Sequence, residues 1–306
     1  MLPVGRSSRF LAGAALVGTL VTGYLQTASP SVSAAPNKPG DGVRAAATYD
    51  ACGEVRTKVD GTPWTCTFAD NFNGKSLDGG NWLVGETAFS GFTTGSTCFT
   101  ARNVAVRWGM LRLTARDEGY PFTCRSPNGS FVTRYTGGHI GTRGRFTQTY
   151  GKFEIRARYP RTTAGVGIGY WLYPAKLTYG AWPASGEIDI AEWWSNVPNT
   201  TLPSLHYPGS NPSVDSGWGC TVATPTYFHT YGVEWSSTEM VFKIDGQECF
   251  RRSWTPAWPL VAPQPFDHPF EMVLNAGVDR TTGPNAVTAA TVLPATYEVD
   301  YVKAWR

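Results

Sequence analysis

The chain has 306 residues, of which 42% are hydrophobic and 16% charged, and its formal net charge is +3. Because no basic run accompanies this small net charge, the sequence does not favour binding to nucleic acid or to an anionic membrane surface. The four histidines are scattered and no Cys-x-x-Cys pair occurs, so the composition also argues against a zinc site.

The first residues have the features of a secretory signal peptide. Arg6 and Arg9 precede a mainly apolar run over 10–24, and small residues at 33–35 offer a cleavage site. We expect a signal peptide over 1–35 and therefore export, with an uncleaved membrane anchor as the alternative. Residues 36–48, rich in Ala, Pro and Gly, are expected to form a disordered leader to one domain over 49–306.

Strand patterns dominate the first half of this domain. Apolar and polar residues alternate over 111–115 and over 152–159, and convincing helical periods are absent. Each alternating segment predicts a strand with one face toward a core.

The stretch 185–194 carries three acidic residues beside two tryptophans. In a regular strand Glu187 and Asp189 share a face, but Glu192 would point the opposite way. One extra residue, Ala191, would form a β-bulge and return Glu192 to the face of the other two acids. This arrangement predicts an active site on a bulged strand.

The last part of the domain again predicts strands. Residues 240–244 and 247–250 flank Asp245-Gly246, which is a typical hairpin turn, and 297–305 reads as a closing strand. The chain also contains 34 glycines and 22 prolines, which suits many turns. The predicted fold is therefore an all-β sandwich.

Six cysteines in an exported chain suggest three disulfides, and fifteen pairings are possible. Sequential pairing closes only local loops, and on that ground we expect Cys52–Cys66, Cys98–Cys124 and Cys220–Cys249.

Paired carboxyl groups suit cleavage of a glycosidic bond. In retaining enzymes one acts as nucleophile and the other as acid and then base, about 5–5.5 Å apart. From the crowding of charge we expect Glu187 as the ionised nucleophile, Glu192 as the protonated acid/base, and Asp189 as the group that orients Glu187. The strand must bend for Glu187 and Glu192 to converge. The alternatives are a solvated strand face and a calcium site, but the neighbouring tryptophans favour sugar binding.

The motif resembles glycoside hydrolase family 16, in particular its laminarinase-like endo-β-1,3-glucanases, which carry Glu-x-Asp-x-x-Glu. Further segments similar to that family occur in the same order, at 68–78, 150–154, 170–174, 182–190, 228–235, 265–275 and 299–302. The resemblance implies a jelly-roll β-sandwich of two curved antiparallel sheets with a concave substrate cleft, and it assigns the same roles to Glu187 and Glu192.

The resemblance also suggests residues that support the site. Trp171, Trp182 and Trp193 are expected to line the sugar cleft, His206 to hydrogen-bond a sugar or Glu192, and Asn275 to face the cleft from a neighbouring strand.

Two departures from the family pattern concern a metal and a charge. Many members bind a structural calcium with a Glu at the position of Asn71 and a residue equivalent to Asp300, so Asn71 makes calcium doubtful and no cofactor is expected. The run Gly137-Gly138-His139-Ile140 replaces Ser-Gly-Arg-Ile/Leu and so removes a cation near the cleft.

The expected function is that of a secreted, retaining endo-glycosidase acting as a monomer on a β-linked polysaccharide, foremost β-1,3-glucan. The alternatives are a galactan-directed hydrolase of agarase or galactanase type, a transglycosylase with the same residues, and a carbohydrate-binding jelly roll without catalysis.

Overall fold

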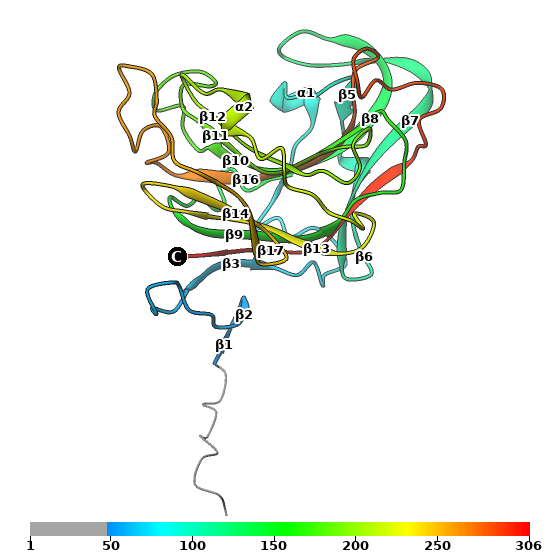
Figure 1. Ribbon diagram of the computed structural model, residues 1–306. Coiled ribbons are helices and arrows are strands. Elements are labelled where there is room, and N and C mark those ends of the chain that lie inside the picture. Colours follow the sequence, from blue (N-terminus) through cyan, green and yellow to red (C-terminus); the bar gives the residue numbers. More distant parts are fainter. Residues whose placement is uncertain (1–47) are drawn as a thin grey trace, which may run out of the picture. The chain divides into compact units, whose positions relative to one another are not determined.

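The computed structural model describes residues 48–306, which form two curved β-sheets packed face to face (Figure 1). The signal peptide and the leader expected over 1–48 lie outside the described residues except for Thr48. The strands are β1 (Tyr49–Asp50), β2 (Gly53–Glu54), β3 (Cys66–Asp70), β4 (Leu83–Val84), β5 (Thr97–Phe99), β6 (Val104–Arg107), β7 (Met110–Cys124), β8 (Phe131–Gly141), β9 (Gly151–Arg158), β10 (Val166–Pro174), β11 (Glu187–Trp194), β12 (Leu202–His206), β13 (His229–Trp235), β14 (Met240–Ile244), β15 (Gln247–Arg252), β16 (Phe270–Val278) and β17 (Ala295–Trp305).

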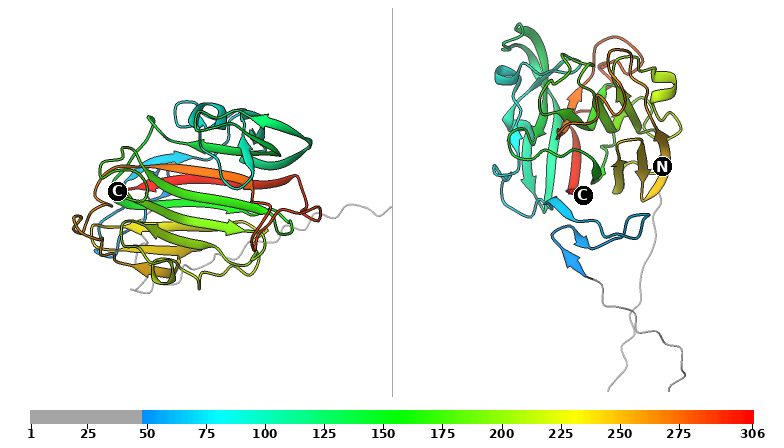
Figure 2. Two further views of the ribbon diagram at one scale, coloured as in Figure 1. Left: turned by 90° about the horizontal axis from the view of Figure 1, so that it is seen from above. Right: turned by 90° about the vertical axis from the view of Figure 1, so that its left-hand side faces the viewer.

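One sheet carries the acidic strand near its edge. Its order is β12-β11-β10-β16-β8, with β4 paired to the end of β8. The other sheet has the order β7-β17-β9-β13-β14-β15, with β3 beside β17 and β6 beside β7. The long strands β7 and β8 pair with each other and so connect the two sheets. Seen from above, the strands run side by side across the molecule (Figure 2).

The predicted jelly-roll sandwich is confirmed, with one local difference. All pairings between the main strands are antiparallel except that of β5 with β8, which is parallel. Helical structure in residues 48–306 is limited to α1 (Thr87–Ser90), α2 (Pro212–Asp215) and the 3-10 turn η1 (Ala101–Asn103). No helix in this part of the chain has the length and apolarity needed to span a membrane.

The strands predicted from alternation are confirmed. Strand β9 alternates buried and partly exposed residues along its whole length, as a strand with one face on a core must. The predicted hairpin is formed by β14 and β15, and its turn residues Asp245 and Gly246 have φ angles of 50° and 76°. This pair of positive angles suits the twist of a two-residue hairpin.

The three sequential disulfides are also confirmed, with Cα–Cα distances of 5.6 Å for Cys52–Cys66, 5.8 Å for Cys98–Cys124 and 5.2 Å for Cys220–Cys249. Between the sheets lies an apolar core rich in aromatic rings, to which the inward side chains of β9, β10, β11 and β17 contribute. Burial of that face leaves the opposite face of β10 and β11 free to build a cleft.

Candidate active site

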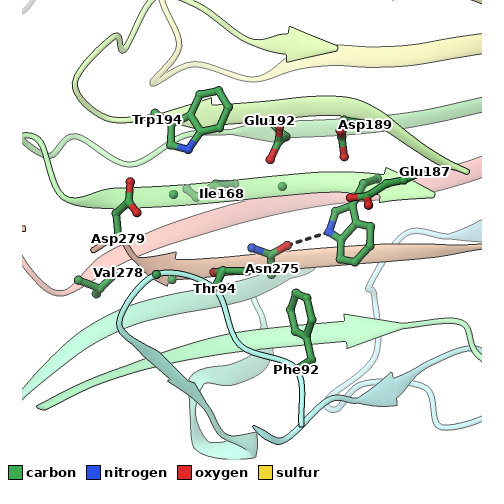
Figure 3. Close-up of a pocket in the computed structure, with 15 residues that line it drawn as sticks. Phe92, Thr94, Ile168, Glu187, Asp189, Glu192, Trp194, Asn275, Val278 and Asp279 are labelled. Atoms are coloured by element: carbon green, nitrogen blue, oxygen red, sulfur yellow. Dashed lines mark hydrogen bonds between the residues drawn. The ribbon is translucent and has the colours of Figure 1, made fainter. Parts of the chain in front are cut away.

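Strand β11 presents its three acids on the face opposite the core. Its neighbour β10 pairs Trp171 with Asp189 but Tyr170 with Ala191, so the register skips Ile190. Both Ile190 and Ala191 are buried in the core, and the next residue, Glu192, returns to the cleft face. The expected bulge is therefore present. Glu187, Asp189 and Glu192 form a row along one strand (Figure 3).

The expectation that Trp193 lines the cleft is wrong. Its side chain is 1% exposed and stacks on Tyr159 in the core, with ring centroids 4.9 Å apart and planes 4° apart. The indole N–H donates to the carbonyl of Pro198 at 2.8 Å. The bulge that brings Glu192 to the cleft face also turns Trp193 inward, so Trp194 faces the cleft in its place.

Strand β10 supplies the floor beside the acids. Gly169 lies opposite Glu192 and Gly167 opposite Trp194. At these two positions β10 has no side chain that could stand between the acidic strand and β16. A Cβ atom at Gly169 would lie 3.0 Å from Asn275 Oδ1. The two alternate glycines therefore keep this part of the cleft open.

Trp171 and Asn275 both reach the cleft as expected, and they bind each other. The Trp171 indole N–H donates to Asn275 Oδ1 at 2.8 Å (Figure 3). Because this bond uses the amide oxygen, the amide NH₂ of Asn275 is left to face a ligand.

Trp182 and His206 flank the acids at the other end of β11. The exposed indole of Trp182 donates its N–H to the Glu187 carboxylate. His206 pairs with Glu187 in the sheet register, and its Nε2 lies 2.8 Å from Asp189 Oδ2. That contact is close enough for an ion pair when the histidine is protonated, but it lacks hydrogen-bond alignment. The expected contact of His206 with Glu192 is replaced by one with Asp189.

Two cavities open along this face and meet at Glu187. The smaller one, of about 160 Å³, contains Asp189, Glu192 and Trp194. The larger one, of about 720 Å³, extends past Trp182. Phe92, Trp171 and Glu187 line both cavities, so they are continuous parts of one cleft.

Burial and neighbouring charges shift the pKa values of the three carboxyl groups. Burial, followed by the charge of Asp189, raises the pKa of Glu187 to about 8. Burial raises the pKa of Asp189 to about 7. Burial together with the charges of Asp189 and Glu187 raises the pKa of Glu192 well above its usual range. The three groups therefore cannot all be ionised at neutral pH.

The two calcium candidates lie elsewhere. The Asp300 carboxylate accepts a hydrogen bond from the Arg156 guanidinium at 2.6 Å, and Asn71 is exposed. A guanidinium on the carboxylate does not favour a cation there. Within residues 48–306 the one cluster of potential metal ligands is Asp50, Cys52 and Cys66, whose cysteines are joined in a disulfide.

Sequence reasoning missed several residues of the cleft. The strand alternation after the bulge could have identified Trp194, and the alternate glycines at 167 and 169 could have suggested an open floor. Phe92 comes from a loop that crosses to the site, and nothing in its local sequence indicates that position.

Comparison with known proteins gives a consistent assignment. The family described as Glycosyl hydrolases family 16 matches residues 96–293. A β-glucanase of Rhodothermus marinus is 33% identical over 215 residues, which cover 67% of this chain and 70% of that protein. A glucan endo-1,3-β-glucosidase A1 of Niallia circulans is 29% identical over 78% of this chain, and the match spans only 37% of that longer protein.

The fold is likewise similar to that of solved enzymes. The X-ray structure of the laminarinase from Rhodothermus marinus superposes with a TM-score of 0.64 at 30% sequence identity, covering 79% of this chain and 97% of the laminarinase.

Proposed function

The chain belongs to glycosyl hydrolases family 16 and is an endo-acting glycoside hydrolase, and from that premise we propose that it cleaves β-1,3-linked glucan with retention of configuration. The observation that carries this proposal is the row of Glu187, Asp189 and Glu192 on the cleft face of β11. Two carboxyl groups of this kind suffice for a double displacement.

In the first step Glu187 attacks the anomeric carbon while Glu192 protonates the departing oxygen. Glu192 suits the acid role because burial and two neighbouring carboxylates hold its proton. Glu187 must be ionised, and the Trp182 N–H favours its ionised form. The pKa values of Glu187 and Asp189 are both raised, so the two carboxyl groups compete for a proton. Transfer of that proton from Glu187 to Asp189 leaves Glu187 ionised for the attack.

In the second step water replaces the departed sugar. Glu192, now ionised, takes a proton from that water, and the water oxygen attacks the glycosyl–Glu187 ester from the opposite face. Asp189 then returns a proton to the released Glu187 carboxylate. The nearby His206 lowers the pKa of Glu187 and of Glu192, and so favours the ionised form of both carboxyl groups.

The cleft supports internal cleavage of a polymer. The two cavities continue on either side of Glu187, so a chain can extend past the reacting bond in both directions. Indole and phenyl rings of Trp171, Trp194 and Phe92 border the path and suit the apolar faces of sugar rings.

The disulfides indicate the compartment in which the enzyme acts. Three disulfides support an oxidising compartment and therefore export. We further propose that the enzyme acts as a monomer on polysaccharide and needs no cofactor, since the two glutamates supply both proton transfer and the nucleophile.

Activity on a panel of polymers tests the substrate. Laminarin should release reducing ends rapidly, first as mixed oligosaccharides, whereas agarose and arabinogalactan should release little. Glu187→Gln should lower the rate on laminarin by on the order of 10³-fold or more, because glutamine is not a nucleophile. Glu54→Gln, an exposed control, should keep the wild-type rate. Release from agarose or arabinogalactan but not from laminarin would contradict the glucan assignment.

A further inference from the structure

His139 lies on β8, across the cleft floor from the acidic strand. In the sheet register His139 pairs with Asn275, Asn275 with Gly169, and Gly169 with Glu192. These four residues form a row across β8, β16, β10 and β11. The His139 ring also borders the larger cavity, so the row ends in a polar side chain at the wall of the cleft.

Aromatic rings fix the orientation of this imidazole. The centroid of the Phe92 ring lies 4.8 Å from that of His139, and the centroid of Phe99 lies 5.5 Å away. The backbone N–H of Gly85 donates to the His139 carbonyl at 2.9 Å and holds Gly85 against the ring. The imidazole is therefore packed on several sides before any ligand arrives.

The two ring nitrogens have different surroundings. Nδ1 is buried and has no hydrogen-bond partner among the described residues. A Cβ atom at Gly85 would lie only 1.7 Å from Nδ1, which means that an α-hydrogen of Gly85 points at this nitrogen. A proton on Nδ1 would collide with that hydrogen, whereas a lone pair accepts it as a weak contact.

The proton of the neutral ring therefore belongs on Nε2. Burial lowers the pKa of His139 to about 4, so the ring is uncharged at neutral pH. Because Nδ1 is the enclosed nitrogen and the ring borders the cavity, Nε2 is the nitrogen that a ligand can reach. The site thus offers a fixed, uncharged N–H donor.

We propose that His139 is a specificity-determining residue that donates its Nε2–H to a hydroxyl oxygen of the bound glucan, on the side of the cleft opposite β11. This inference rests on the proposed glucanase function and adds a residue to it. A neutral donor in an aromatic setting fits an uncharged hexose, because it binds a hydroxyl oxygen without bringing an unpaired charge into the cleft.

Calorimetric titration with laminarihexaose, using the Glu187→Gln variant to prevent turnover, tests the inference. Adding His139→Phe keeps an aromatic ring beside Phe92 but removes the donor. The dissociation constant should rise roughly five- to tenfold, as for the loss of one hydrogen bond. His229→Phe, the same change at a histidine on the outer sheet, should leave the affinity unchanged.

A second arm moves the imidazole without removing it. Gly85→Ala places a methyl group where Nδ1 lies and should weaken binding to a similar extent. In a His139→Ala background the methyl group has room, so Gly85→Ala should have no further effect. If His139→Phe fails to fold, this cycle decides the question.

The outcomes separate the two claims. An unchanged dissociation constant in His139→Phe, or equal effects of Gly85→Ala in both backgrounds, would overturn the role of His139 alone. If the Glu187→Gln parent does not bind laminarihexaose at millimolar concentration, the glucanase proposal fails and the inference fails with it.

Discussion

The carboxyl groups of Glu187, Asp189 and Glu192 compete for negative charge because burial withdraws water from all three. Burial raises the pKa of all three, and repulsion from neighbouring carboxylates raises those of Glu187 and Glu192 further. A positively charged, oxocarbenium-like sugar relieves the repulsion, so the charge that is unfavourable in the free enzyme becomes favourable in the transition state.

This arrangement predicts a measurable effect on stability. The folded-state pKa of Glu192 lies well above the ordinary value of 4.5, so the folded protein holds a proton that the unfolded chain has lost. Stability should therefore fall as the pH rises above about 4.5 toward the folded-state pKa. The glutamine of Glu192→Gln cannot ionise. The melting temperature of this variant should therefore exceed that of the wild type by a margin that grows from about pH 5 to about pH 8.

Thermal unfolding across this pH range checks the prediction, with Glu54→Gln as the control because Glu54 is exposed. The control should show no growing margin. A margin for Glu192→Gln that stays constant with pH would mean that Glu192 ionises freely in the folded protein.

At the scale of the element, the bulge in β11 decides which side chains face the substrate. Ile190 and Ala191 together occupy the core side, and because the bulge absorbs the extra residue, Glu192 and Trp194 face outward while Trp193 turns inward. One strand thereby contributes both the reacting groups and an aromatic ring to the cleft, and anchors itself with the other tryptophan.

Deletion of Ala191 should remove the bulge without turning Glu192 away from the cleft. The shortened run Glu-Ile-Asp-Ile-Glu places its three acids at alternate positions, so regular alternation keeps Glu192 on the cleft face and Trp193 in the core. We therefore expect hydrolysis of laminarin to fall by less than the roughly 10²-fold that loss of a general acid costs. The melting temperature should fall because the core loses the buried Ala191 side chain.

Deletion of Gly79 is a suitable control, since this residue is exposed and an added Cβ there meets nothing within 4 Å. The control should keep its activity. An Ala191 deletion variant that loses roughly 10²-fold or more of its activity on laminarin would contradict this prediction and show that Glu192 needs the bulge itself, and not only its face of the strand.

For the whole molecule, the features predictable from sequence are those set by local alternation and short loops. The β9 strand, the Asp245-Gly246 hairpin and the three disulfides all follow from neighbours in the chain. The bulge also follows from spacing, and the same alternation, carried one residue further, places Trp193 inside.

The remaining features depend on contacts between distant segments. The bond from Trp171 to Asn275 joins residues 104 positions apart, and Phe92 reaches the cleft from a loop outside the acidic sheet. The orientation of His139 depends on Gly85 and on two phenylalanines from other segments. Only the register of β8, β16 and β10 brings these groups together, and no local pattern specifies that register.

The roles of Glu187 and Glu192 are tested most directly by the configuration of azide products. With an aryl β-laminaribioside whose leaving group needs no acid, Glu192→Ala should accumulate the glycosyl enzyme, and azide should attack it to give the β-glycosyl azide. In Glu187→Ala, azide should occupy the vacated space and give the α-glycosyl azide. NMR spectroscopy distinguishes the two anomers. The predicted result is β from Glu192→Ala and α from Glu187→Ala, and the reverse pattern would contradict the assignment.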